Sequence, residues 1–184
     1  LLLIYRIFVK PSGFGILPRL ANYAYKRYLL GKSVPMTVMI ALTYRCQCGC
    51  VHCSASGLSG GKPELSTQEV KNIIAAAREL GVPKIGFTGG EPLLRADLPE
   101  LAACAAGHGL SVSIDTNGIL LSEKTAAVLK EAGISNINIS LDSADPKRHD
   151  RLRKSEGCFD AALAGVKHCA ALGIPAVVST YITD

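Results

Sequence analysis

Apolar and polar residues recur along the chain at two spacings, one typical of buried strands and one typical of helices. Short runs of β-branched and aliphatic residues predict five strands, at 34–44, 84–88, 110–115, 136–141 and 176–182. Between them, segments with apolar positions at helical spacing predict four helices, at 66–80, 98–107, 122–132 and 159–172.

Local signals mark the ends of these helices. Ser66 precedes the first helix and Glu69 follows three residues later, which predicts a capping box, and Gly81 is placed to end that helix. Ser122 is the expected N-cap of the third helix, which Gly133 would end. Capping residues and apolar periodicity therefore agree on where the helices lie.

Strand and helix alternate four times, and a fifth strand follows. Such alternation is typical of right-handed βαβ units, so it predicts an α/β fold built on one parallel sheet. In such folds the functional residues gather beyond the carboxyl ends of the strands. Here those ends carry a cysteine-rich loop, Gly-Gly-Glu-Pro at 89–92, Asn117 and Asp142, so we expect the site at this edge.

Residues 1–33 form an N-terminal extension before the first predicted strand. Apolar residues recur at helical spacing from 17 to 30 with Arg19, Lys26 and Arg27 between them, which predicts an amphipathic helix with a basic side. Such a helix can pack on the main domain or make a weak contact with a membrane surface, and both interpretations stay open. The apolar run at 1–9 is interrupted by Arg6 and is much shorter than the roughly 20 residues of a membrane span.

Composition narrows the class of protein. Of 184 residues, 48% are hydrophobic and 19% are charged, and 20 Lys and Arg against 15 Asp and Glu give a formal charge of +5. The chain is too hydrophobic to be disordered, and its length suits one domain. The basic residues are scattered, so the charge does not indicate a nucleic-acid partner.

Seven cysteines are the unusual feature of the composition. An odd number, with four crowded between 46 and 53, does not resemble a disulfide framework, and no export signal is evident, so we expect reduced thiols and a cytoplasmic location. Thiolates suit iron–sulfur clusters, zinc and copper(I). Cys46, Cys50 and Cys53 have the spacing C-x3-C-x2-C, and three thiolates can hold three irons of a [4Fe–4S] cube and leave the fourth iron open.

Cys48 adds a fourth thiol to this loop, which leaves a structural zinc site as an alternative. We expect the Cys48 side chain to point away from the ligands or to be a spare thiol. Cys104, Cys158 and Cys169 lie in or beside predicted helices and are expected in the core. Three histidines are expected at the surface or at helix ends: His108, His149 and His168.

The cysteine spacing resembles the motif of the radical S-adenosylmethionine (SAM) enzymes. Three further segments resemble motifs of this superfamily: Phe87-Thr88-Gly89-Gly90-Glu91-Pro92-Leu93-Leu94-Arg95, Thr116-Asn117-Gly118 and Ile139-Ser140-Leu141-Asp142-Ser143. The resemblance covers about residues 36–184. It implies a partial TIM-like (β/α)6 barrel with about five parallel strands present, and a core domain at 34–184 that is truncated at its C-terminus.

The resemblance implies that SAM binds at the end of the second strand. Adjacent glycines let a backbone approach a ligand, and Glu91 adds a carboxylate suited to an ammonium group. By resemblance, Gly89, Gly90 and Glu91 bind the SAM amino group, while the amine and carboxylate of SAM chelate the open iron. Arg153 would hold the SAM carboxylate, because a guanidinium matches a carboxylate bidentately.

Four further cofactor-binding positions follow from the same resemblance. His52 holds the place of a residue, usually aromatic, whose backbone lies near the adenine. Ser140 matches a position near the methionyl group or the ribose, and Asn117 and Asp142 are candidates for the pocket wall. The two-glycine adenine-binding pattern that some members carry on the fifth strand is absent from this sequence.

By resemblance, the chain is an enzyme that uses a [4Fe–4S] cluster to cleave SAM reductively, giving a 5′-deoxyadenosyl radical that abstracts hydrogen from a small-molecule or peptide substrate. An electron donor such as flavodoxin or ferredoxin is implied. Residues 149–162 and the end of the fifth strand resemble members that modify peptides or haem precursors and carry a C-terminal auxiliary-cluster domain. Two alternatives stay open: a molybdenum-cofactor-type cyclase, which 89–98 and 138–142 resemble, and a non-catalytic iron–sulfur or zinc module.

Overall fold

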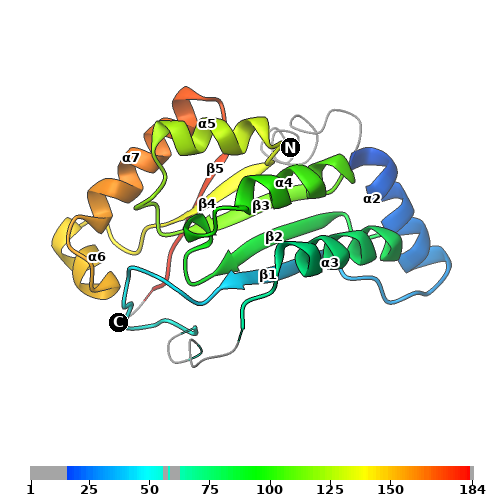
Figure 1. Cartoon of the computed structure of the whole chain (residues 1–184), viewed down its shortest axis with the longest axis horizontal. Helices are drawn as coiled ribbons and strands as arrows, with labels where there is room; N and C mark the ends of the chain where they lie inside the picture. The colour runs from blue at the N-terminus through cyan, green and yellow to red at the C-terminus, as the bar shows by residue number, and fades with distance from the viewer. Residues whose placement is uncertain (1–15, 56–57, 59–62, 183–184) are drawn as a thin grey trace.

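A computed structural model describes residues 16–55, 58 and 63–182. Five strands form one sheet: β1 (Thr37–Thr43), β2 (Lys84–Gly89), β3 (Ser111–Thr116), β4 (Asn136–Ser140) and β5 (Ala176–Ser179) (Figure 1). The connecting elements are α3 (Thr67–Leu80), the 3-10 turn η3 (Pro92–Leu94), α4 (Leu98–Gly107), α5 (Glu123–Glu131), α6 (Pro146–Arg153) and α7 (Cys158–Ala171).

The sheet order is β1-β2-β3-β4-β5, and each strand pairs in parallel with the next one in the sequence. This confirms the predicted α/β fold with five parallel strands. Because neighbouring strands run in the same direction, their carboxyl ends lie at one edge of the sheet, where Thr43 of β1 pairs with Gly89 of β2. Successive βαβ units of this kind are the repeating element of TIM-like barrels.

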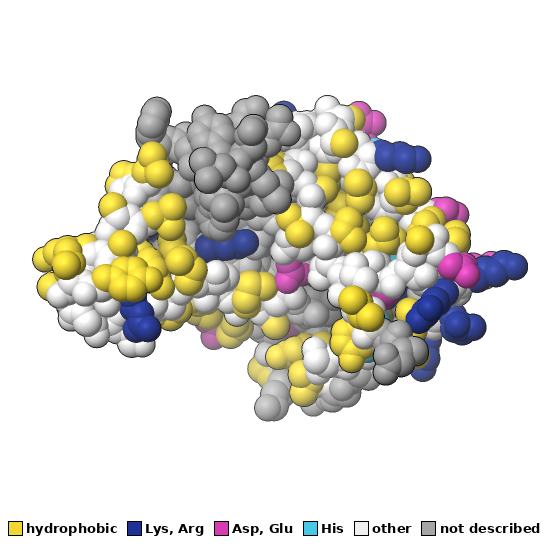
Figure 2. All heavy atoms as spheres, turned by 180° about the vertical axis from the view of Figure 1, so that it is seen from behind, with side chains coloured by type: hydrophobic (Ala, Val, Ile, Leu, Met, Phe, Trp, Pro, Cys, Tyr) yellow, Lys and Arg dark blue, Asp and Glu magenta, His cyan; other side chains and the backbone are white. Residues whose placement is uncertain are grey.

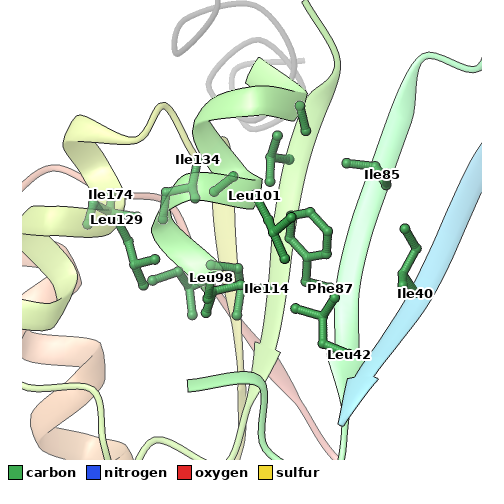
Figure 3. Packing of buried hydrophobic residues seen from close by; sticks show 14 of the residues in the cluster. Ile40, Leu42, Ile85, Phe87, Leu98, Leu101, Ile114, Leu129, Ile134 and Ile174 are labelled. Carbon is green, nitrogen blue, oxygen red and sulfur yellow. The ribbon is translucent and has the colours of Figure 1, made fainter. Parts of the chain in front are cut away.

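One face of the sheet carries the hydrophobic core. Alternate residues of the central strands, including Ile85, Phe87 and Ile114, are fully buried against the helices. Figure 3 shows Phe87 and Ile114 beside Leu98 and Leu101 of α4. Side chains of a strand alternate between two faces, so burying these residues directs their sequence neighbours to the opposite face.

That opposite face is polar. Asn136 Nδ2 donates to Asn138 Oδ1 at 2.7 Å, and Asn138 Nδ2 donates to Asp115 Oδ1 at 2.5 Å. Asp115 and Asn138 are paired across β3 and β4, and Asp115 is the residue before the end of β3. In a TIM-like barrel this face lines the interior, so a row of polar side chains runs along the interior wall toward the carboxyl edge.

The helix ends follow the sequence signals. The Ser66 side chain accepts from the Glu69 N–H while the Glu69 side chain accepts from the Ser66 N–H, which confirms the capping box. Gly81 ends α3 with a φ of 90°, a conformation that glycine adopts without strain. Ser122 caps α5 by accepting from the Thr125 N–H, as predicted.

The N-terminal extension contains α2 (Ile16–Ala24) followed by a π-helical turn, η2 (Tyr25–Leu29). Lys26 Nζ donates to Glu79 O and Leu80 O at 3.2 and 3.0 Å, and the Arg19 guanidinium donates to His108 O. Lys26 therefore joins the extension to the last turn of α3, and Arg19 joins it to the end of α4. At the C-terminus of a helix a cation also interacts favourably with the helix dipole. The prediction for residues 1–15 lies outside the described residues.

Two strands are shorter than predicted by three residues or more, and β4 is shorter by one. The strand expected at 34–44 begins at Thr37, because Pro35 has no N–H to contribute to a ladder. The strand expected at 176–182 ends at Ser179, since the Tyr181 N–H donates to Asp142 instead of to a neighbouring strand. Within the described part of the chain, no helix is long and apolar enough to cross a membrane.

Candidate functional site

A cavity of about 200 Å³ opens at the carboxyl edge of the sheet, between the cysteine loop and the ends of β2, β3 and β4. Nine of the predicted site residues line it: Cys46, Cys50, His52, Cys53, Gly89, Gly90, Asn117, Ser140 and Arg153. Glu91 and Asp142 are not among the lining residues, and both side chains are buried. The topology thus brings together segments that are far apart in the sequence.

Thr88, Asp115 and Thr116 also line the cavity, although none of them was predicted as a site residue. Thr88 follows the buried Phe87 and Asp115 follows the buried Ile114, so both occupy the face opposite the core. Strand alternation was the signal that could have found them.

The cysteine loop is fixed to two other elements by backbone hydrogen bonds. The Val51 N–H donates to Leu152 O, in the last turn of α6, at 2.9 Å. The Glu91 N–H donates to Arg45 O, at the start of the loop, at 2.8 Å. Although the loop has no regular secondary structure, its position therefore depends on α6 and on the end of β2.

The thiols of the loop interact with one another. The Cys48 N–H donates to Cys46 Sγ at 3.4 Å. Hydrogen bonding from Cys48 lowers the pKa of Cys46 and of Cys50, each to about 6, and burial opposes this effect. Thiolates are the form of cysteine that binds metal. The expectation that Cys48 points away is wrong: its thiol lies beside those of Cys158, Cys46 and Cys50, and Cys48 lines the same cavity.

The three proposed ligands suit an iron–sulfur cluster. Cys46 and Cys53 are exposed, Cys50 is half-buried, and all three border one cavity. Asn117 Nδ2 donates to Cys46 Sγ and Arg153 Nη1 donates to Cys50 Sγ, both at 3.7 Å. Among the described residues, no three His, Cys, Asp or Glu side chains converge closely enough for a single metal ion. Cysteine thiolates are the groups that hold iron–sulfur clusters, so the chemistry of this donor set suits such a cluster.

Gly89 and Gly90 are required by the close approach of β1 and β2. A Cβ on Gly89 would lie 2.1 Å from Thr43 O, and a Cβ on Gly90 would lie 2.3 Å from Arg45 O. Gly89 also has a φ of 136°. The Gly90 N–H donates to Thr43 O at 2.6 Å, so the glycines bring the ends of both strands together at the cavity wall.

The carboxylate of Glu91 is fully buried and connects the ends of β2 and β3. Oε1 accepts from Thr116 Oγ1 at 2.8 Å and from the Leu93 N–H at 3.0 Å, and Oε2 accepts from the Asn117 N–H at 2.9 Å. Burial raises the pKa of Glu91 to about 7, although these three hydrogen bonds favour the ionised form. The Glu91 side chain thus fixes the strand ends that carry Gly90 and Asn117.

Asp142 and Arg153 form an ion pair behind the cavity wall. Arg153 Nε donates to Asp142 Oδ2 at 2.7 Å and Nη2 donates to Oδ1 at 2.9 Å. Asp142 Oδ1 also accepts from the Tyr181 N–H at 3.0 Å. Burial alone would raise the pKa of Asp142, but the hydrogen bonds from Arg153 and Tyr181 outweigh burial and lower it. The pair therefore stays ionised at neutral pH.

His52 lies at the edge of this pair. Its Nε2 is 3.6 Å from Asp142 Oδ2, and its ring stacks on Tyr181 with centroids 4.4 Å apart. His52 Nδ1 is buried and has no hydrogen-bond partner within the described residues. The imidazole thus connects the cysteine loop to the chain that follows β5, and its second nitrogen is available to a ligand.

His149 is fully buried, so the prediction that it lies at the surface or at a helix end is wrong. It precedes Arg153 by four residues on α6, and residues at this spacing share a helix face. Its Nδ1 accepts from the Asp142 N–H at 3.1 Å, and its ring packs edge-on against Phe159. Burial lowers the pKa of His149, which keeps the ring neutral and able to accept this bond. The other two histidines lie at or near the ends of helices, as predicted: His108 and His168.

Comparison with known proteins identifies relatives over most of the chain. The sequence profile of the Radical SAM superfamily matches residues 40–183. An Fe-coproporphyrin III synthase of Methanosarcina barkeri is 44% identical over 134 residues, which are 72% of this chain and 33% of that protein. A Methanopyrus kandleri protein named "Probable GTP 3′,8-cyclase" is 39% identical over 159 residues, which are 86% of this chain and 51% of that protein. The chain thus spans from a third to a half of the length of these relatives.

Solved structures share the fold at lower identity. Streptococcus suis SuiB bound to precursor peptide SuiA superposes with a TM-score of 0.74 at 20% identity, covering 91% of this chain and 37% of that one. At this identity the likeness concerns the fold, and it supports a partial TIM-like barrel for the five-stranded sheet.

Proposed function

The chain belongs to the radical SAM superfamily, and on that premise we propose that it is part of an enzyme that binds a [4Fe–4S] cluster through Cys46, Cys50 and Cys53 and cleaves SAM reductively. The observation that carries the proposal is that these three thiols border one cavity together with the adjacent glycines at the end of β2, Gly89 and Gly90. When bound, the cluster and SAM supply a 5′-deoxyadenosyl radical that takes a hydrogen atom from the substrate.

The cavity wall offers groups for each part of SAM. The backbone of Gly89 and Gly90 borders the cavity and suits the amino end, and an ammonium group nearby would favour the ionised form of Glu91. Ser140 borders the cavity where the methionyl group or ribose is proposed, and the unpartnered Nδ1 of His52 suits the adenine.

Two further residues are proposed to contribute to SAM binding. Arg153 lines the cavity and is proposed to meet the SAM carboxylate, while Asn117 extends the wall from the end of β3. Asp142 was expected in the wall as well. Because its carboxylate is buried and paired with Arg153, we propose that it supports the wall from behind.

The substrate is proposed to be a haem precursor, another cofactor precursor or a peptide. The first of these rests on the 44% identity to the M. barkeri synthase. The second candidate function, cyclisation of a nucleotide, rests on the 39% identity to the M. kandleri protein. A small cytoplasmic reductant such as flavodoxin or ferredoxin is the proposed electron donor, because the reaction consumes one electron from outside the chain.

A weak contact with an anionic membrane surface is proposed for the N-terminal extension. Tyr25, Tyr28 and Leu29 are 51%, 78% and 76% exposed, and Arg27 and Lys32 beside them are exposed cations. Figure 2 shows hydrophobic and basic side chains together at the left end of the molecule. Residues 1–63 contain eight Lys and Arg and no Asp or Glu, so this third of the chain suits an anionic partner.

Vesicle sedimentation tests the membrane contact. The full-length protein is expected to bind phosphatidylcholine vesicles that contain phosphatidylglycerol and to lose most of this binding in the Tyr28→Ser/Leu29→Ser variant. Leu80→Ser, which changes an exposed leucine on α3, is the matched control and should bind like the wild type. Equal binding by all three proteins, or no binding by the wild type, would contradict the contact.

Iron and sulfide analysis of reconstituted variants tests the ligand set. The wild-type full-length protein is expected to bind about four irons and four sulfides at this site, above any auxiliary clusters. Cys50→Ala should lose this set, whereas Cys48→Ala should keep it because Cys48 is a neighbour of the proposed ligands and not one of them. Equal loss in both variants would show that the assigned ligands are wrong.

A further inference from the structure

We infer that Arg153, held in place by Asp142, raises the reduction potential of the cluster by donating a hydrogen bond to the sulfur of Cys50. This inference rests on the proposed function, since it assumes that Cys50 is a cluster ligand. It assigns Arg153 a positioning and tuning role that does not depend on SAM.

Each nitrogen of the Arg153 guanidinium donates one hydrogen bond to the protein. Nε and Nη2 donate to the two oxygens of Asp142, and Nη1 donates to Cys50 Sγ at 3.7 Å. Because a guanidinium is planar and rigid, the two bonds to Asp142 determine the direction of the third. Arg153 cannot leave Cys50 by rotation without breaking a two-point ion pair.

Asp142 is itself fixed from three sides. Its Oδ1 accepts from the Tyr181 N–H after β5, and its own N–H donates to His149 Nδ1 in α6. Its side chain is fully buried, and that of Arg153 is 11% exposed. Solvent therefore screens the pair little, and a hydrogen bond in such surroundings is electrostatically stronger than one at the surface.

A donor at a ligand sulfur favours the reduced cluster. Reduction adds an electron whose charge is spread over the cluster and its thiolates, and a hydrogen bond from a cation stabilises that charge. The Cys50 sulfur has such a donor in Arg153, while the Cys46 sulfur has the neutral amide of Asn117. Arg153 is thus the charged side chain that contacts a proposed ligand sulfur within the described residues.

The test is an EPR-monitored redox titration of the reconstituted full-length protein without SAM. Arg153→Gln should shift the midpoint potential of this cluster to a more negative value, and Arg153→Lys should shift it less in the same direction. Arg151→Gln, which removes an exposed cation from the same turn of α6, is the matched control and should leave the potential unchanged.

A double variant separates the hydrogen bond from net charge. Asp142→Asn/Arg153→Gln removes one negative and one positive group, so the net charge stays that of the wild type while the donor to Cys50 is lost. A midpoint potential that stays below the wild-type value therefore supports the hydrogen bond as the cause of the shift. A return to the wild-type value would overturn the inference, as would an unchanged potential in Arg153→Gln with only SAM affinity lost.

Two further outcomes concern whether the cluster is retained at all. Loss of this cluster in both single Arg153 variants would make Arg153 a requirement for cluster retention and would overturn its tuning role. Absence of this cluster from the wild-type protein would instead contradict the proposed function, which distinguishes the two failures.

Discussion

The Asp142 carboxylate accepts two hydrogen bonds from the Arg153 guanidinium, of 2.7 and 2.9 Å, behind the wall of the cavity. Asp142 follows β4 and Arg153 ends α6, so the pair joins a strand end to the helix that supports the cysteine loop. The position of Cys50 thus depends on a contact between residues that are eleven positions apart.

Asp142→Ala is predicted to destabilise the protein strongly, because it leaves the guanidinium of Arg153 buried without its counter-ion. Breaking a buried ion pair in this way costs about 3 kcal/mol or more. Urea denaturation of the full-length protein without cofactors measures the effect. Asp160→Ala, at an exposed position in the first turn of α7, is the control and should cost about 1 kcal/mol at most, the usual contribution of a charge to the helix dipole. Equal effects of the two substitutions would contradict the role given to the pair.

Gly90→Ala is predicted to cost about 1–3 kcal/mol, the usual range for overpacking. The added Cβ would lie 2.3 Å from Arg45 O, so the backbone at the start of the cysteine loop must move. Gly107→Ala is the matched control, because a Cβ at the end of α4 meets nothing within 4 Å. Thermal unfolding should separate the two variants, and a Gly90→Ala protein as stable as the control would contradict the close approach.

Glu91 is predicted to make stability depend on pH. Its pKa is about 7 in the folded protein against an ordinary value of 4.5, so between these values the folded state retains a proton that the unfolded state releases. The stability contribution of Glu91 therefore falls as pH rises from about 4.5 to 7 and levels off above that.

Urea denaturation of the cofactor-free wild type and of Glu91→Gln tests this dependence. The free energy of unfolding of the wild type, relative to that of the variant, should drop by roughly 2 kcal/mol between about pH 5 and about pH 8. A difference that stays constant over this range would show that burial does not raise the pKa of Glu91.

Hydrophobic periodicity and capping signals predicted the fold well because both are local. The capping box at Ser66 and the N-cap at Ser122 were predicted from neighbouring residues alone, and both are present. The end of β5 could not be predicted in this way. Tyr181 leaves the sheet because its N–H donates to Asp142, a partner distant in sequence.

The motifs predicted which residues gather at the site but not the direction of each side chain. Glu91 and Asp142 are carboxylates that a linear motif places beside a ligand. In the fold Glu91 is buried against the end of β3, and Asp142 is buried against Arg153 of α6. His149 is polar on a strongly charged helix, and only the packing of α6 on its neighbours shows that it is buried. The direction of the Cys48 side chain was misjudged because spacing alone does not show the bend at Gln47, where the Cys48 N–H turns back to Cys46 Sγ.

The most direct test of the central claim is an anaerobic assay for 5′-deoxyadenosine with the reconstituted full-length protein, SAM and dithionite. We expect the wild type to form 5′-deoxyadenosine and Cys50→Ala to form none, with Cys48→Ala retaining activity. A wild-type protein that holds stoichiometric zinc in the cysteine loop and leaves SAM intact would contradict the account.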